Sequence, residues 1–190
     1  MKKLHEIMVK MPLIGGPGAP PIKEWNMIPP YNQICCDITS GKIFVFDTQK
    51  GFYINVFDEN GRNLYTINKD KEIEKIEVPD EYRDKKTKEF KQDQFWLELK
   101  KPGLIFPEYF PAFRWANVNH GKIYVQTYKE IGNKTQFIVL DLGGKILKEI
   151  YLPVPDPDSD HRRQTVYKNR LYQLVENEET ETWDLYIYKM

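Results

Sequence analysis

Three aspartates at alternate positions are the densest group of potential metal ligands in the chain. They lie in the stretch PDPDSDH and are Asp156, Asp158 and Asp160. Carboxylates at this spacing supply the first ligands of a calcium-binding loop. That loop also requires glycine at its sixth position and glutamate at its twelfth, where this chain has His161 and Tyr167. We therefore interpret the stretch as a polar connecting loop and predict no metal site.

The residue types that carry out catalysis form no recognisable arrangement. The histidines His5, His120 and His161 are far apart in the sequence and give no metal-ligand spacing. The motifs of serine hydrolases, zinc proteases and P-loop proteins are absent. Cys35 and Cys36 are adjacent, and neighbouring strand residues point to opposite faces, so we expect one thiol in a core and the other outside. The sequence predicts no catalytic residue and no cofactor.

The composition is that of a folded domain without a strong charge preference. The 190 residues contain 28 basic and 28 acidic side chains, 41% hydrophobic residues and 14% aromatic residues. Balanced charge gives no general attraction to nucleic acid or to an anionic membrane. No apolar run of about 18 residues is present to span a membrane. We expect one domain over 1–190, rich in strands because aromatic residues favour them.

Two parts of the chain repeat the same pattern, and a third repeats it with less fidelity. GKIFVFDT and GKIYVQTY begin at Gly41 and Gly121. INVFDENGRNLYTI and FIVLDLGGKILKEI begin at Ile54 and Phe137. The third copy contains KNRLYQLV and TWDLYIYKM. Internal repetition of this kind is typical of a structure built from similar units.

Each copy consists of short apolar runs separated by turn residues. Such runs are typical of strands. Dipeptides such as Asn60-Gly61 and Gly143-Gly144 allow the positive φ that tight hairpins require. Each copy is therefore predicted to be an antiparallel meander, with four strands in 32–68 and in 112–152 and three strands in 163–190.

Two segments lie outside the repeats. Residues 80–101 lack glycine and proline and are rich in helix formers, with Pro79 before them and Pro102 after them. We predict an α-helix inserted there, between the first and second copies. Residues 11–30 contain GGPGAP and further prolines, and we predict a linker.

The N-terminal segment 1–10 matches the strand that the third copy lacks. KKLHEI, which contains Leu4, His5, Glu6 and Ile7, is similar to GKILKEI at the end of the second copy. Four-stranded repeats around an axis form a β-propeller, and closing the ring removes unpaired strand edges. We therefore predict that this segment is the closing strand of the third copy.

The stretches GKIFVFDTQKGFYINVFDENGRNLYTI, FPEYFPAF with the following LDLGGKILKEIYLP, and LYQLVENEETETWDLYIYKM point to one family. They resemble the bacterial six-bladed β-propeller proteins of the NHL and TolB-like type, over most of the chain after Pro29. The resemblance implies an all-β fold of propeller blades that acts as a binding scaffold more often than as an enzyme. It also implies the cell envelope or periplasm as one location, although the compartment stays open.

The resemblance implies six blades, whereas this chain has three. Either two chains join about a twofold axis and exchange their closing strands, or the chain is the C-terminal half of a longer protein. We favour the homodimer because the chain carries a closing strand itself. The leading function is a non-catalytic binding scaffold. The alternatives are a hydrolase- or lyase-type enzyme with its site in the central channel, and a fragment that folds only by association.

The innermost strands of a propeller line its channel, where a ligand is expected. Arg114, Asn117, Arg162 and Arg163 lie on or near these strands in the repeat pattern. Arginines there favour an anionic or carboxylate-bearing small ligand, and a protein is the other partner considered. The aromatic and proline clusters at 26–34 and 106–115 are expected to pack where the first two copies begin.

Overall fold

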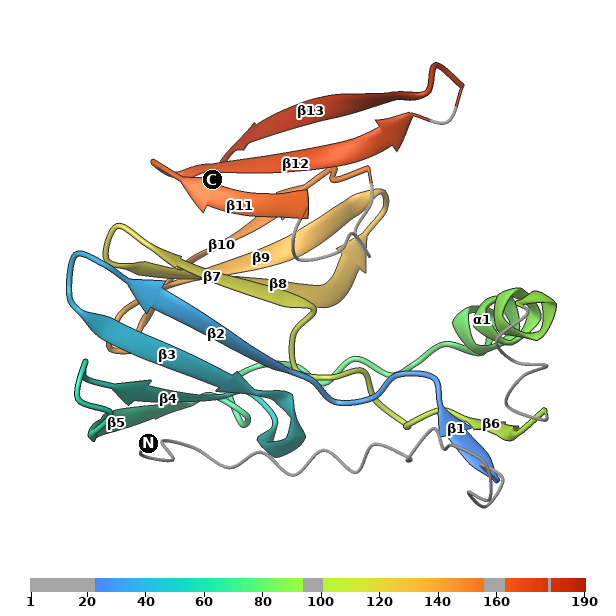
Figure 1. Ribbon diagram of the computed structural model, residues 1–190, viewed down its shortest axis with the longest axis horizontal. Coiled ribbons are helices and arrows are strands. Elements are labelled where there is room, and N and C mark those ends of the chain that lie inside the picture. Colours follow the sequence, from blue (N-terminus) through green and yellow to red (C-terminus); the bar gives the residue numbers. More distant parts are fainter. Residues whose placement is uncertain (1–22, 94–100, 156–162, 178) are drawn as a thin grey trace, which may run out of the picture.

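The computed structural model describes residues 23–93, 101–155, 163–177 and 179–190. Within them the chain is mostly β-strand with one α-helix, so the all-β prediction is confirmed (Figure 1). The closing strand predicted over 1–10 lies outside the described residues. So do Asp156, Asp158, Asp160 and Arg162.

Three antiparallel sheets follow one another along the chain, each joining consecutive strands. The first sheet contains β2 (Asn32–Asp37), β3 (Lys42–Asp47), β4 (Tyr53–Phe57) and β5 (Asn63–Asn68). The second contains β7 (Trp115–Asn119), β8 (Lys122–Ile131), β9 (Lys134–Asp141) and β10 (Ile146–Leu152). The third contains β11 (Gln164–Tyr167), β12 (Arg170–Asn177) and β13 (Thr182–Lys189). These strands fall within the three predicted meanders.

The first hairpin of the second and third sheets turns through the same kind of backbone. His120 and Gly121 have φ of 49° and 71°, and Lys168 and Asn169 have φ of 48° and 57°. Two successive residues with positive φ are the requirement of a tight two-residue hairpin. The pairs Asn119↔Lys122 and Tyr167↔Arg170 flank these turns. The two hairpins are therefore equivalent, and the pairs that flank them align the second sheet with the third residue by residue.

The sheets pack face to face in the order in which they occur in the chain. β2 contacts β7, and β7 contacts β11, so the first strands of successive sheets are neighbours (Figure 1). Alternate side chains of the second sheet supply both of its apolar faces. One face joins the first sheet in a core that includes Phe44, Val56, Ile123 and Leu140. The other joins the third sheet through Tyr124, Phe137, Val166 and Leu171.

The helix and a small extra sheet lie to one side of the three sheets (Figure 1). α1 (Asp80–Gln92) ends earlier than the predicted 80–101 because Asp93 has an extended backbone. β1 (Glu24–Asn26) pairs in parallel with β6 (Gly103–Ile105). β1 therefore gives regular structure to part of the predicted 11–30 linker.

α1 buries no residue and is held by contacts at a few points. The ring of Tyr82 meets Phe110 edge-on, with 5.0 Å between centroids, and the ring of Phe90 stacks on Trp25 at 6.2 Å. The Arg83 guanidinium donates from Nε to the Val78 carbonyl at 3.0 Å and from Nη2 to the Pro107 carbonyl at 3.2 Å. The helix is thus attached to the segment that leads into the second sheet.

Candidate functional site

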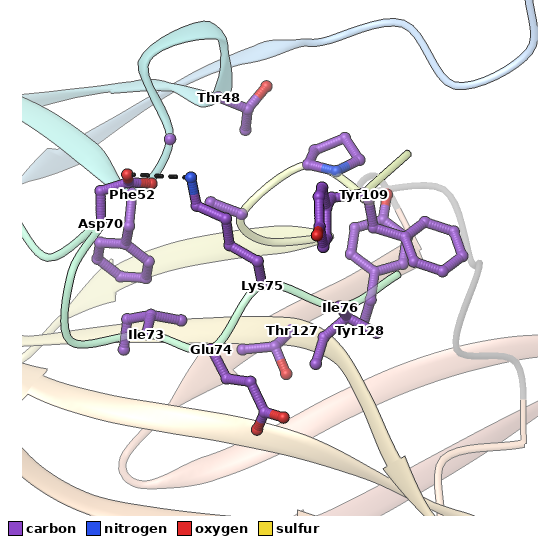
Figure 2. A pocket seen from close by; sticks show the side chains of 14 residues that line it. Thr48, Phe52, Asp70, Ile73, Glu74, Lys75, Ile76, Tyr109, Thr127 and Tyr128 are labelled. Carbon is purple, nitrogen blue, oxygen red and sulfur yellow. Dashed lines mark ion pairs between the residues drawn. The ribbon is translucent and has the colours of Figure 1, made fainter. Parts of the chain in front are cut away.

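A cavity of about 150 Å³ lies where the first sheet meets the second (Figure 2). Its walls come from the turn between β3 and β4, from the segments 70–76 and 109–112, and from β8. Thr48 and Phe52 line it from the first sheet, and Thr127 and Tyr128 line it from the second. Because both sheets contribute, the cavity depends on their packing together.

The charged side chains around this cavity are paired within the chain. Lys75 Nζ lies 3.4 Å from an oxygen of Asp70 (Figure 2). Lys129 Nζ lies 2.6 Å from an oxygen of Glu74. The hydrogen bond to Glu74 raises the pKa of Lys129. A charged ligand entering here would have to compete with one of these ion pairs.

The hydroxyl groups of the cavity wall are also engaged in hydrogen bonds. Thr48 Oγ1 donates to the Tyr31 carbonyl at 2.7 Å and accepts from the Tyr31 amide at 2.8 Å. Thr127 Oγ1 donates to Gln136 Oε1 at 2.7 Å. The Tyr31 hydroxyl donates to the Phe113 carbonyl at 2.7 Å, and burial raises the pKa of Tyr31 well above its ordinary value. The Tyr31 hydroxyl thus connects the segment before β2 to the segment before β7, whereas Thr48 and Thr127 form their hydrogen bonds within their own sheets.

Arg114, one of the predicted channel residues, belongs to an aromatic stack beside the cavity. Its guanidinium lies over the ring of Tyr128, 4.6 Å from the centroid, and Phe110 stacks on Tyr128 with 4.2 Å between centroids. Arg114 Nη1 is 3.4 Å from a Glu130 oxygen. An anionic ligand would therefore have to replace a carboxylate that already meets this charge.

The other predicted ligand-binding residues do not gather around Arg114. Asn117 lies in β7, and its buried Oδ1 accepts no hydrogen bond within the described part of the chain. Arg163 precedes β11, with its guanidinium 4.6 Å from the centroid of the Trp183 ring and 3.9 Å from a Glu176 oxygen. Asn117 thus belongs to the second sheet, whereas Arg163 directly precedes the third sheet and packs on the Trp183 side chain of β13.

The aromatic clusters expected where the first two copies begin have the packing role that the sequence predicts. Phe113 is fully buried, and its ring meets Tyr31, Phe46 and Phe52 edge-on at 5.6–5.8 Å. Tyr31 and Phe113 come from the two clusters, and the other two rings come from the first sheet. This aromatic group joins the first two sheets behind the cavity.

A buried group of glutamine side chains between the second and third sheets is absent from the sequence-based predictions. Gln126 and Gln173 are fully buried and Gln164 nearly so. Gln164 Nε2 donates to Gln126 Oε1 at 3.0 Å. The repeat did contain a sequence signal for this polar contact, because Gln126 occupies the position that Phe46 occupies in the first copy. A polar residue at an apolar repeat position indicates a local hydrogen-bonded contact.

The two cysteines lie on opposite sides of β2, as alternation predicts. Cys35 packs against the core between the first two sheets, and its Sγ donates to the Ala116 carbonyl at 3.7 Å. Burial raises the pKa of the Cys35 thiol to about 12. Cys36 is exposed. Both cysteines are free thiols.

The third sheet presents an apolar face that the described part of the chain leaves uncovered. Tyr167, Leu174, Trp183, Leu185 and Ile187 are large hydrophobic residues of this sheet that are exposed. Cross-strand pairs place Leu174 beside Leu185, and Tyr172 beside Ile187. β13 pairs with β12 only, within the described residues, so its other edge carries unpaired backbone groups there. This face and this edge together form the candidate interaction site.

Among the described residues, no cluster of three His, Cys, Asp or Glu side chains is arranged to hold a metal ion. None of the helices described is both long enough and apolar enough to cross a membrane. Comparison of the chain with protein-family models, with curated proteins and with solved structures found no match.

Proposed function

We propose that this protein is a non-catalytic interaction scaffold of the β-propeller type. In this proposal the three sheets are three blades, and two copies of the chain join about a twofold axis to form a ring of six. Ligands of such a ring bind at its central channel, which the strands β2, β7 and β11 would line. A scaffold of this kind acts by presenting a rigid concave surface.

The stacking of the sheets supports the blade interpretation. Successive sheets pack face to face, and their first strands are neighbours. Blades of a propeller are related in the same way, since each four-stranded sheet stands beside the next around an axis. The first and second sheets have four strands each, whereas three are described in the third.

The observation that carries the proposal is the edge of β13 with which none of the described strands pairs. An open edge of regular, apolar strand invites another strand to pair with it. In the first two sheets this position is occupied by β5 and β10, which contain NLYTI and ILKEI. KKLHEI at residues 2–7 has the same pattern. We propose that residues 2–7 of a second copy pair with β13 and complete its sheet.

Light scattering coupled to size-exclusion chromatography tests this proposal. The chain has a mass of 22.6 kDa, and we expect the intact protein to elute with twice that mass. A variant lacking residues 1–10 should elute as a monomer or aggregate. A labelled peptide of residues 1–10 should then bind the truncated protein by strand addition, whereas a scrambled peptide of the same composition should not.

Two results would overturn the proposal. One is a stable monomer from the intact chain at micromolar concentration. The other is a truncated chain that remains a dimer, because the N-terminal segment would then have no part in closing the ring.

A further inference from the structure

We infer that the exposed face of the third sheet is an interface that packs against the first sheet of a second copy. The inference deepens the proposed function, and it rests on the six-bladed dimer. Strand exchange concerns only the edge of β13. The face is a separate surface, and its role follows from comparing the three sheets position by position.

The register of the sheets makes this comparison possible. The first hairpin of each sheet is flanked by one cross-strand pair, and these pairs are Asp37↔Lys42, Asn119↔Lys122 and Tyr167↔Arg170. Counting from these pairs, Tyr172 and Leu174 correspond to Phe44 and Phe46 of the first sheet. The cross-strand partners then place Leu185 and Ile187 at the positions of Ile54 and Val56.

These four positions are buried in the first two sheets, whereas three of the four are exposed in the third. Phe44, Phe46, Ile54 and Val56 are 0% exposed. Their counterparts in the second sheet are all buried, with exposed fractions of 0–1%, and are Tyr124, Gln126, Phe137 and Val139. In the third sheet Leu174, Leu185 and Ile187 are 42%, 56% and 51% exposed. Tyr172 is half-buried.

In the first and second sheets, the element that covers these four positions is the next sheet along the chain. The first sheet packs its face on the second, and the second packs the same face on the third. The surface that continues this series is a further sheet of the same kind. If two chains are related by a twofold axis, this further sheet is the first sheet of the second copy. A ring of six sheets then closes, and each sheet packs against its neighbours on both faces.

The first strands of the sheets identify which residues meet. Gln33 receives a hydrogen bond from the Ala116 amide at 2.9 Å, and the Cys35 thiol donates to the Ala116 carbonyl. Thr165 occupies the position of Cys35 in the third sheet, and Ile34 occupies the position of Ala116. We therefore place Thr165 of one copy against Ile34 and Cys36 of the other. On this face of the first sheet Ile34 is 66% exposed and Cys36 is exposed, whereas Val45, Asn55 and Phe57 are buried, so the exposed part of the face that Thr165 would meet lies along β2.

A charge placed on the face tests this interface. Leu185→Glu should abolish the dimer in light scattering and raise its Kd at least about a hundredfold, because a carboxylate would be buried without a partner. Ile131→Glu is the matched control. Ile131 is 59% exposed at the tip of the β8–β9 hairpin, and its variant should remain dimeric. Circular dichroism and thermal unfolding of both variants verify that each is folded.

Chemical cross-linking tests the residues predicted to meet. Thr165→Cys should be joined to Cys36 of a second copy by a short bis-maleimide, giving a covalent dimer on a denaturing gel. The control Thr165→Cys/Cys36→Ser should give none. Loss of the dimer in Leu185→Glu together with this cross-link supports the interface.

The outcomes separate this inference from the strand-exchange proposal. If removal of residues 1–10 disrupts the dimer while Leu185→Glu leaves it intact, the edge is used and the face inference is wrong. If the intact protein is a monomer and gives no cross-link, both fail, and the face then serves a different protein or another part of a longer chain.

Discussion

At the scale of single residues, the two thiols show how one strand separates reactive from unreactive chemistry. Cys35 and Cys36 are adjacent in β2, and alternation alone predicts that they point to opposite faces. The structure confirms this prediction. The sequence could not indicate that the Cys35 thiol meets the Ala116 carbonyl of the second sheet, because that contact joins segments far apart in the chain.

The raised pKa of Cys35 predicts a selective reaction and a pH-dependent stability. Burial places this pKa at about 12, above the ordinary value of 9.0. At pH 8 a thiol reagent should therefore label Cys36 rapidly and Cys35 only after unfolding. Between pH 9 and pH 12 the unfolded chain loses this proton and the folded chain keeps it, so stability should fall as pH rises through this window.

Urea unfolding of the Cys35→Ala variant measures this contribution. Relative to the parent chain, its loss of unfolding free energy between pH 8 and pH 10 should be smaller by about 1 kcal/mol. Cys36→Ala is the control and should retain the pH dependence of the parent. Equal pH dependence in the parent and the Cys35→Ala variant would contradict the assignment.

At the scale of elements, the turn between β9 and β10 is a point of close contact between the first two sheets. Gly144 has φ of 88°. A Cβ at this position would lie 2.5 Å from Cγ2 of Ile67, a buried residue of β5. The site therefore requires glycine both for its backbone and for the close approach of the first sheet.

Two glycine substitutions separate these requirements. Gly144→Ala should lower the free energy of unfolding by about 2–4 kcal/mol, because backbone strain and overpacking against Ile67 add together. Gly132→Ala should cost only about 1–2 kcal/mol. Gly132 also has positive φ, at 60°, but no atom lies within 4 Å of its added Cβ. Urea unfolding measures both, and equal losses would show that the contact with Ile67 is unimportant.

The sequence predicts the long elements better than the short ones. The meanders follow from alternation and from turn residues such as those around Gly121, which are local signals. β1 and β6 have three residues each, too few to show a period, and their parallel pairing joins distant segments. α1 stops at Gln92 although the following residues favour a helix, because Asp93 is extended, and helix propensity is a weak guide to an end.

At the scale of the whole molecule, the repeats predict which sheets exist but not what lies between them. The cavity lined by Thr48 and Tyr128 forms only because the first and second sheets pack against each other. Arg114 forms an ion pair with Glu130, although its position in the sequence alone predicts that it binds a ligand. Chemistry between sheets is set by the packing of distant segments, which no short pattern reports.

The proposed ring of two chains predicts that thermal stability depends on protein concentration. Unfolding that is coupled to dissociation becomes less favourable as concentration rises. For two chains of 190 residues, an unfolding entropy of about 2 cal/mol/K per residue gives a rise in Tm of about 2 °C for each tenfold increase in concentration. Calorimetry over a hundredfold range of concentration would resolve it.

The same measurement on variants connects the ring to its two surfaces. Leu185→Glu and the chain lacking residues 1–10 should unfold at a Tm that is independent of concentration, because each would be a monomer. Ile131→Glu should keep the concentration dependence of the parent. A parent chain whose Tm does not change with concentration, together with monomeric mass in solution, would mean that the exposed face of the third sheet is not covered by a second copy.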